Sequence, residues 1–474
     1  MIRIYLDKQI FSYLKKGDKP EYTKLLADIK QSKNNLLYCY SHALLLDLKN
    51  DTSDIKYEEL EFIETIVDDN YLSYNESKKK TYCYLIKPLQ AFKDYIDEDD
   101  EEDISFDNLF DIDLKYVTEE QKEQFKQAKD LLYNQKIDFG FSQLQNLPED
   151  MVGPLGKILP IGTDSMTMME WAKHFMGTLK LIQEDKTVYK GLRNMIDKNL
   201  NNEKFTININ EVDFNNDLKN DDLKKSFTDF VNNNINPKGD KEVSEYDFFT
   251  NAYFSLDILG ISKEPASKVK FRNVMNDSFH SYYGASSDFI VSNDDGFLNK
   301  SKVMYKLLNI KTQVLHIDEF IKSINLLSHT SEQNISTFFE LLNNDLEKGI
   351  VLNVKSSIRY DRKTTTIKPY HTYLGYFNEI DVITQKRKNY LYLSHRKDNY
   401  AVSYFYREIE AIVNKSLEIF GTDSDYMGTY NWDKENDEIH SNKWNGRRWF
   451  FESHEILLEF NKGTSKLALS ISPL

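Results

Sequence analysis

The sequence predicts an α/β protein in which a parallel sheet flanked by helices is interrupted by a mostly helical insertion and followed by an α+β domain. Strand-like and helix-like segments alternate over residues 1–48, a pattern typical of a parallel sheet. The length of 474 residues exceeds one ordinary domain and predicts two or three. From about residue 326, short segments rich in Tyr, Thr and Val predominate, which indicates a separate domain.

The amino-terminal elements place two acids beside predicted strands. Residues 1–6 (MIRIYL) form an apolar, β-rich run, and Asp7 follows it directly. Residues 35–40 (NLLYCY) predict a second strand, and the helix predicted over 42–48 carries Asp47. Ligands of α/β sheets bind at the carboxyl edge of the strands, so both positions suit a functional site.

The predicted insertion covers residues 61–244. Within it, residues 94–113 hold eleven acids and no Lys or Arg, which predicts a solvated loop. Residues 166–182 form an amphipathic pattern, and we expect a helix capped by Asp164 or Ser165.

A second pairing of strand and acid follows the insertion. Asp277 lies in a helix-like stretch that ends at a glycine, and residues 289–291 (FIV) form a short apolar strand. Four polar residues come directly after this strand: Ser292, Asn293, Asp294 and Asp295. Asp294 is in a position to act in a site, whereas Asp295 is more typical of a turn.

The carboxyl-terminal domain is predicted over residues 326–474. Residues 350–400 form alternating strands, and residues 402–420 predict an amphipathic helix that ends at Gly421. The sequence leaves two interpretations open for a group near the end of the chain, a stacking and phosphate-binding patch or ordinary strand packing: Trp444, Arg447, Arg448 and Trp449.

The net charge of −15 is unevenly distributed along the chain. Leaving out the eleven acids of residues 94–113 reduces it to −4. Residues 355–397 carry ten Lys or Arg against three acids, a local charge of +7, with tyrosines interleaved. Local charge decides binding, so the overall acidity does not exclude a polyanionic substrate. A solvated face of a sheet is the alternative for this span.

Composition indicates the compartment. No run of about 18 apolar residues predicts a membrane span, and the amino terminus enters a strand without the pattern of a secretory signal. Cys39 and Cys83 are too few for a disulfide framework and stand in apolar contexts, so we expect buried thiols. Together these features predict a cytoplasmic protein without membrane partners.

Four acids are candidates for one shared pocket: Asp7, Asp47, Asp277 and Asp294. Carboxylates about 5 Å apart repel by roughly 3 kcal/mol per pair at an effective dielectric of 20. A hard divalent cation such as Mg²⁺ or Mn²⁺ would neutralise them, since both prefer oxygen ligands. A metal held by acids activates water and neutralises charge on a phosphate, so the pattern favours phosphodiester hydrolysis. Helix capping or a turn role is the alternative for each acid.

Three segments together resemble the PIN domain, a nuclease fold related to the catalytic core of flap endonucleases: IRIYLD at the start, YSHALLLDL, and NDSFHSYYGASSDFIVSND. In that family an acid ends the first strand, as Asp7 does, and another follows a Ser or Thr at the second helix, as Asp47 follows Ser41. A third acid opens a helix, as Asp277 does, and a fourth stands at the end of the next strand, as Asp294 does.

The resemblance covers residues 1–60 and 245–325. It implies that these four acids bind Mg²⁺ or Mn²⁺ and act catalytically on single-stranded nucleic acid, with RNA favoured. It also implies a role as a bacterial toxin or antiviral defence effector, with an inhibitor, sensor or other system protein as partner. The family usually has Glu at the second position, and Asp51 is the nearest substitute for Asp47.

Two other functions are alternatives to an endoribonuclease. A degenerate PIN scaffold would bind RNA or a protein without cleavage, and the shorter Asp47 favours it. A haloacid-dehalogenase-like phosphatase requires a second acid two residues after Asp7, where Gln9 stands, and is excluded. Weaker candidates for substrate contacts are His280, Ser292, Asn293, Lys386, Arg387 and Lys388.

Overall fold

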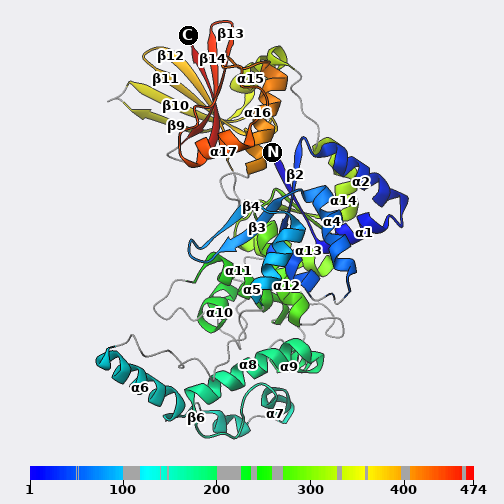
Figure 1. The fold of residues 1–474 in the computed structure, drawn as a ribbon, viewed down its shortest axis with the longest axis vertical. Helices are drawn as coiled ribbons and strands as arrows, with labels where there is room; N and C mark the ends of the chain where they lie inside the picture. The colour runs from blue at the N-terminus through cyan, green and yellow to red at the C-terminus, as the bar shows by residue number, and fades with distance from the viewer. Residues whose placement is uncertain are drawn as a thin grey trace. The chain divides into compact units, whose positions relative to one another are not determined.

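The computed structural model describes most of the chain (Figure 1). The described residues are 1–49, 51, 53–99, 118–138, 140–146, 149–199, 226–235, 243–258, 271–327, 334–357, 361–396, 406–461 and 466–474. Among them, no helix is long and apolar enough to cross a membrane. The α/β class predicted from the sequence is confirmed.

The first sheet has six strands in the order β4-β3-β2-β1-β7-β8. All neighbouring pairs are parallel except β3 with β4. Its strands are β1 (Ile2–Leu6), β2 (Leu36–Ser41), β3 (Asn70–Asn75), β4 (Lys80–Leu85), β7 (Phe289–Ser292) and β8 (Gln313–His316). Every residue of β2 is buried, as expected for a strand inside a parallel sheet with both faces covered.

The helices that alternate with these strands account for the rest of this region. They are α1 (Lys8–Lys16), α2 (Pro20–Ser32), α3 (His42–Lys49), α4 (Ile55–Val67), α5 (Pro88–Asp99), α12 (Phe271–Gly284), α13 (Asp295–Leu307) and α14 (Ile317–Leu327). The predicted strands at 1–6, 35–40 and 289–291 are present within a residue or two. Cys39 and Cys83 are buried free thiols, as expected.

The Tyr-rich segment after α4 extends the sheet beyond residue 60. Only residues 76–79 join β3 to β4, and so short a connection permits only an antiparallel pair. The loop predicted over 94–113 is wrong for its first six residues, because residues 94–99 continue α5. Apolar residues at Ala91 and Phe92 bury one face of that helix, and the acids extend it. Residues 100–113 lie outside the described part of the chain.

The chain divides into two compact units. The first comprises Met1–Phe92, His280–Leu298 and Tyr305–Leu474, and the second comprises Lys93–Phe279 and Asn299–Met304. The described part of the second unit is largely helical: α6 (Glu119–Tyr133), η3 (Phe141–Asn146), α7 (Glu149–Gly156), α8 (Met168–Glu184), α9 (Lys186–Asn199), α10 (Phe227–Phe230), η4 (Val231–Ile235) and α11 (Glu245–Ile258). A short pair, β5 (Lys136–Ile137) and β6 (Met166–Thr167), completes it.

Two features of the second unit correct or extend the sequence analysis. The cap of α8 is Thr167 and not Asp164 or Ser165, because Thr167 forms a reciprocal capping box with Glu170. Asp257 is fully buried and accepts from the Tyr189 hydroxyl at 2.7 Å, with the Arg193 guanidinium at 3.2 Å. The burial of this charge is therefore offset by close partners.

The carboxyl-terminal domain is a seven-stranded antiparallel sheet in the order β13-β14-β15-β12-β11-β10-β9. Its strands are β9 (Ile350–Ser357), β10 (Arg362–Lys368), β11 (Glu379–Gln385), β12 (Lys388–Ser394), β13 (Arg447–Phe451), β14 (His454–Asn461) and β15 (Lys466–Pro473). Helices α15 (Ile335–Lys348) and α16 (Tyr406–Phe420) pack on the sheet through a shared apolar core, and α17 (Trp432–His440) follows (Figure 1). Helix α16 ends at Gly421, which adopts a positive φ of 81°, as the sequence predicts.

Strand β9 occupies one edge of this sheet and is exposed along almost its whole length. Four aliphatic side chains on it are between 44% and 57% exposed: Ile350, Val351, Leu352 and Val354. This edge therefore combines open backbone hydrogen-bonding groups with apolar side chains.

The group at 444–449 packs within the domain, apart from one exposed member. Arg447 is buried and donates to Glu435 at 2.6 and 3.0 Å and to Asp423 at 2.9 Å. Trp444 donates its indole N–H to the same Glu435, and Trp449 is 2% exposed. The packing interpretation is thus correct for these three residues, because their polar atoms are used inside the fold.

Helix α16 also joins the carboxyl-terminal domain to the first sheet. Arg3 in β1 donates to Glu408 through Nε at 2.8 Å and through a terminal nitrogen at 2.5 Å, and both side chains are fully buried. Beside this pair, Arg407 donates to Asp69 at 3.0 and 2.7 Å with both side chains partly exposed. Both contacts lie at the amino edge of the sheet, since Asp69 directly precedes β3.

Candidate active site

Three neighbouring parallel strands end with polar side chains at the carboxyl edge of the first sheet. Strand β1 is followed by Asp7, β2 ends with Ser41, and β7 ends with Ser292. The order β2-β1-β7 places Asp7 between the two serines, and its backbone N–H donates to the Val291 carbonyl at 3.0 Å. The edge predicted from the sequence is therefore built from adjacent strands.

Asp7 is a buried carboxylate held by a neighbouring strand. It precedes α1, but its side chain makes no capping hydrogen bond to that helix. Its carboxylate instead accepts a hydrogen bond from the Ser292 hydroxyl at 2.6 Å, and the residue is only 8% exposed. The structure thus gives no support to the alternative that Asp7 serves as a helix cap.

Asp47 is linked to the sheet through a chain of hydrogen bonds. His280 on α12 places Nε2 at 3.0 Å from the Asp47 carboxylate and Nδ1 at 2.7 Å from the Tyr5 hydroxyl. The Tyr5 hydroxyl is also 2.7 Å from the Ser41 hydroxyl. An ionised Asp47 can only accept, so Nε2 carries a proton; in the neutral ring Nδ1 then accepts from Tyr5.

Asp7 and Asp47 are close enough for the charge of one to affect the pKa of the other. Burial raises the pKa of the Asp7 carboxyl and the charge of Asp47 adds to that rise, while His280 and the hydrogen bond from Ser292 oppose it. Burial also raises the pKa of Tyr5 well above its usual value, so its hydroxyl stays protonated. Two carboxylates and a histidine therefore share one partly buried environment.

Asp294 is connected to Asp7 through Ser292. The Ser292 hydroxyl that donates to Asp7 also accepts from the backbone N–H of Asp294 at 3.1 Å. The Asp294 side chain accepts from the Phe297 N–H at 2.9 Å and so caps α13. Asp294 therefore acts as a helix cap, and this hydrogen bond fixes its side chain at the end of β7. Asn293 donates its side-chain amide to the Tyr13 hydroxyl at 3.3 Å.

The two remaining acids differ in their placement. Asp51 accepts from the backbone N–H and the hydroxyl of Ser53, at 2.9 and 2.7 Å, in the loop after α3. Asp47, and not Asp51, is the acid that pairs with His280 and acts on Asp7. Asp277 lies inside α12, three residues before His280, and not at the start of a helix as the sequence suggested. It is half-buried and belongs to the second compact unit, and its place among the metal ligands stays a prediction.

The basic candidates of the carboxyl-terminal domain form a tight turn. Lys386 and Arg387 join β11 to β12 with positive φ angles of 50° and 66°, and Lys388 follows. Two-residue turns with positive φ favour Asn and Gly, so two long basic residues here are an uncommon choice. All three side chains are exposed, where they can meet a polyanion.

Tyr5 is the site residue that the sequence analysis missed. Its signal was present, since Tyr5 and Asp7 are two residues apart and thus on the same face of β1. A tyrosine two positions before a terminal acid, in a strand that is apolar apart from Arg3, is the pattern that would have pointed to it.

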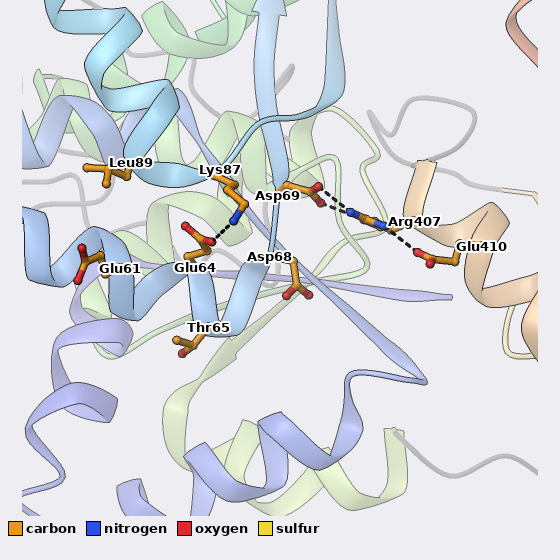
Figure 2. Close-up of a pocket in the computed structure, with 9 residues that line it drawn as sticks. All are labelled: Glu61, Glu64, Thr65, Asp68, Asp69, Lys87, Leu89, Arg407 and Glu410. Carbon is orange, nitrogen blue, oxygen red and sulfur yellow. Dashed lines mark hydrogen bonds and ion pairs between the residues drawn. The ribbon is translucent and has the colours of Figure 1, made fainter. Parts of the chain in front are cut away.

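A separate pocket lies at the amino edge of the same sheet. It measures about 790 Å³, and Figure 2 shows Arg407 between Asp69 and Glu410, with Lys87 paired to Glu64. Its described lining holds five carboxylates against two cations, so it does not suit a phosphate chain. The composition of this lining therefore favours the carboxyl edge as the candidate active site.

No family model matches the sequence, and no curated protein or solved structure matches it either.

Proposed function

We propose that the chain is a metal-dependent nuclease of the PIN type that hydrolyses phosphodiester bonds in single-stranded nucleic acid, with RNA favoured. The observation that carries the proposal is the pair of carboxylates, Asp7 and Asp47, at the carboxyl edge of the parallel sheet, with His280 hydrogen-bonded to Asp47. The exposed basic turn at Lys386–Lys388 supports a polyanionic substrate.

The donor chemistry fits a hard divalent cation. The described residues contain no group of three or more His, Cys, Asp or Glu arranged around a common point. Mg²⁺ is often held by only one or two carboxylates, with waters and substrate phosphates completing its octahedron. Asp7 and Asp47 would supply these carboxylates, and Asp294, linked to Asp7 through Ser292, is the third predicted ligand.

The protein's own contribution is to orient the two acids. The Ser292 hydroxyl holds Asp7, and the His280 N–H holds Asp47, while Tyr5 fixes the histidine ring. Such outer partners set the direction of ligand oxygens. A bound divalent cation would activate water and neutralise charge on the scissile phosphate.

Cleavage of a mixed single-stranded RNA and DNA substrate with Mn²⁺ tests the proposal. Asp7→Asn, Asp47→Asn and Asp294→Asn should each remove metal-dependent cleavage, and asparagine at 294 should still cap α13. Asp295→Asn is the matched control, since Asp295 is exposed in the first turn of the same helix. Wild-type rates in the first three variants, when folded, would contradict the assignment.

Binding without cleavage is the outcome that would favour the scaffold interpretation. If the wild type binds RNA but neither binds Mn²⁺ by calorimetry nor cleaves, the acidic edge is a structural remnant. His280→Gln retains an N–H near Asp47, whereas His280→Ala does not. Weaker Mn²⁺ binding in alanine, restored in glutamine, would show that His280 positions Asp47.

A further inference from the structure

A second cavity, of about 660 Å³, lies in the carboxyl-terminal domain between α15 and the antiparallel sheet. Val382, Leu391 and Ile471 form its floor, because they are cross-strand neighbours on β11, β12 and β15. Leu342 and Leu346 of α15 form the opposite wall. Its volume is in the range of sites that take small organic ligands.

One end of the cavity is aromatic. The rings of Phe339 and Phe451 stack with centroids 5.1 Å apart and an angle of 16° between planes, and His454 lies beside Phe339 at 6.3 Å. Apolar walls with stacked rings at one end suit a flat aromatic ligand.

The rim supplies polar groups at the edge of such a ring. Asn343 and Asn389 both line the opening. The Asn389 side-chain carbonyl accepts from the Thr384 hydroxyl at 2.8 Å, which fixes the amide group in the lining of the cavity. Asn amides pair well with the donor and acceptor edges of nucleobases.

The charge around the cavity changes sharply over a few residues. Its charged lining residues are Glu340 and Glu452, which disfavour an anion inside. The basic turn of Lys386 and Arg387 begins three residues before Asn389 and favours an anion just outside. A ligand with an uncharged flat ring and an attached phosphate matches this change.

We propose that this cavity binds a nucleobase, with the adjoining phosphate on the Lys386–Lys388 turn. The same chemistry is found in a free nucleotide and in an unpaired base of RNA. The proposal does not depend on cleavage at the acidic edge, because binding here needs no metal.

The test is a fluorescence titration of the full-length protein, in EDTA, with 2-aminopurine riboside and its 5′-monophosphate. We expect saturable quenching of the riboside, and tighter, salt-dependent binding of the monophosphate. Phe451→Leu should weaken both by about tenfold through loss of stacking. The matched control is Phe450→Leu, on the opposite face of the same strand and 56% exposed, which should bind as the wild type does.

Two further variants separate the parts of the ligand. Asn389→Ala, at an exposed position that does not endanger the fold, should weaken the riboside. Lys386→Glu with Arg387→Glu should remove only the gain from the phosphate. No quenching by either probe up to its solubility limit, or equal binding by the Phe450 and Phe451 variants, would overturn the proposal.

A short single-stranded RNA carrying one 2-aminopurine identifies the source of the base. Quenching that depends on Phe451 in the RNA supports an anchored unpaired base. Quenching by the monophosphate but not by the RNA supports a free nucleotide. Both results support a nucleobase site in this cavity, and they distinguish a base within RNA from a free nucleotide.

Discussion

The buried pair of Arg3 and Glu408 gives the sharpest prediction about stability. Replacing either residue by Met removes the closest partner of the other buried charge, since both side chains are fully excluded from solvent. Glu408 would retain the amino-terminal ammonium of Met1 at 3.6 Å, so Glu408→Met should cost at least as much as Arg3→Met. Loss of one member of a buried pair costs roughly 3–5 kcal/mol. The double variant, Arg3→Met with Glu408→Met, should recover part of this loss, because two apolar side chains of similar volume need no partner. The Met1 ammonium loses its contact with Glu408 in this variant, which limits the recovery.

Arg407 provides a matched comparison. It also donates two hydrogen bonds to one carboxylate, that of Asp69, but its side chain is 30% exposed and that of Asp69 is 18% exposed. Solvent screens this pair, so we expect Arg407→Met to cost only about 1 kcal/mol from the lost ion pair. Arg407 also pairs with Glu410 at 2.9 Å and lies 4.0 Å from the centre of the Trp432 ring. The comparison therefore sets a buried ion pair against a partly exposed group of contacts.

Urea unfolding followed by tryptophan fluorescence measures these differences. Three of the four tryptophans are in the carboxyl-terminal domain, at 432, 444 and 449, so Trp171→Phe restricts the signal to that domain. The two compact units need not unfold together, which makes a local probe necessary. Equal costs for Arg3→Met and Arg407→Met, or additive costs in the double variant, would refute the reasoning.

Three further predictions concern the site, the basic turn and a buried acid. Because burial raises the pKa of Asp7, its ionised form destabilises the metal-free fold. Asp7→Asn should therefore melt in EDTA at or above the wild-type temperature and lose the stabilisation by Mn²⁺. An undiminished shift of the melting temperature by Mn²⁺ would contradict the proposed metal site. Replacement of Lys386, Arg387 and Lys388 by Glu should weaken RNA binding and lower the slope of log affinity against log salt concentration by roughly one unit per lost phosphate contact. An unchanged slope would show that this span is only a solvated face of the sheet. Burial alone would raise the pKa of Asp345, but hydrogen bonds from Tyr373, His371 and two backbone N–H groups lower it. The ionised Asp345 therefore stabilises the fold above its unfolded pKa of about 3.9, and this stabilisation is lost as the pH falls from that value through the lower pKa of the folded state. Asp345→Asn should therefore cost about 1–3 kcal/mol at pH 7 and less at pH 3, and an equal loss at both values in urea unfolding would argue against this origin.

Local patterns predicted the carboxyl edge of the first sheet well. Asp7 and Ser292 each follow or end an apolar strand, and a parallel sheet brings such ends to one side whatever the number of residues between them. Asp47 could be placed because its helix follows the adjacent strand directly.

Other features depend on contacts that local patterns do not encode. Arg3 looks like an unfavourable residue in an apolar strand until Glu408, 405 positions later, is placed beside it. The pairing of β12 with β15 similarly joins segments about 75 residues apart. The cap of α8 was misplaced because Asp164, Ser165 and Thr167 are all suitable residues, and only the reciprocal bond with Glu170 selects one of them.

The exposed edge of β9 has a consequence for how the protein behaves at high concentration. An open strand with half-exposed Ile350, Val351 and Leu352 is a template on which another chain can add a strand. At low ionic strength the net charge of −15 keeps copies apart. At physiological ionic strength that repulsion is screened beyond about 8 Å. Salt, which weakens most electrostatic contacts between proteins, is therefore expected to promote rather than prevent self-association of this chain.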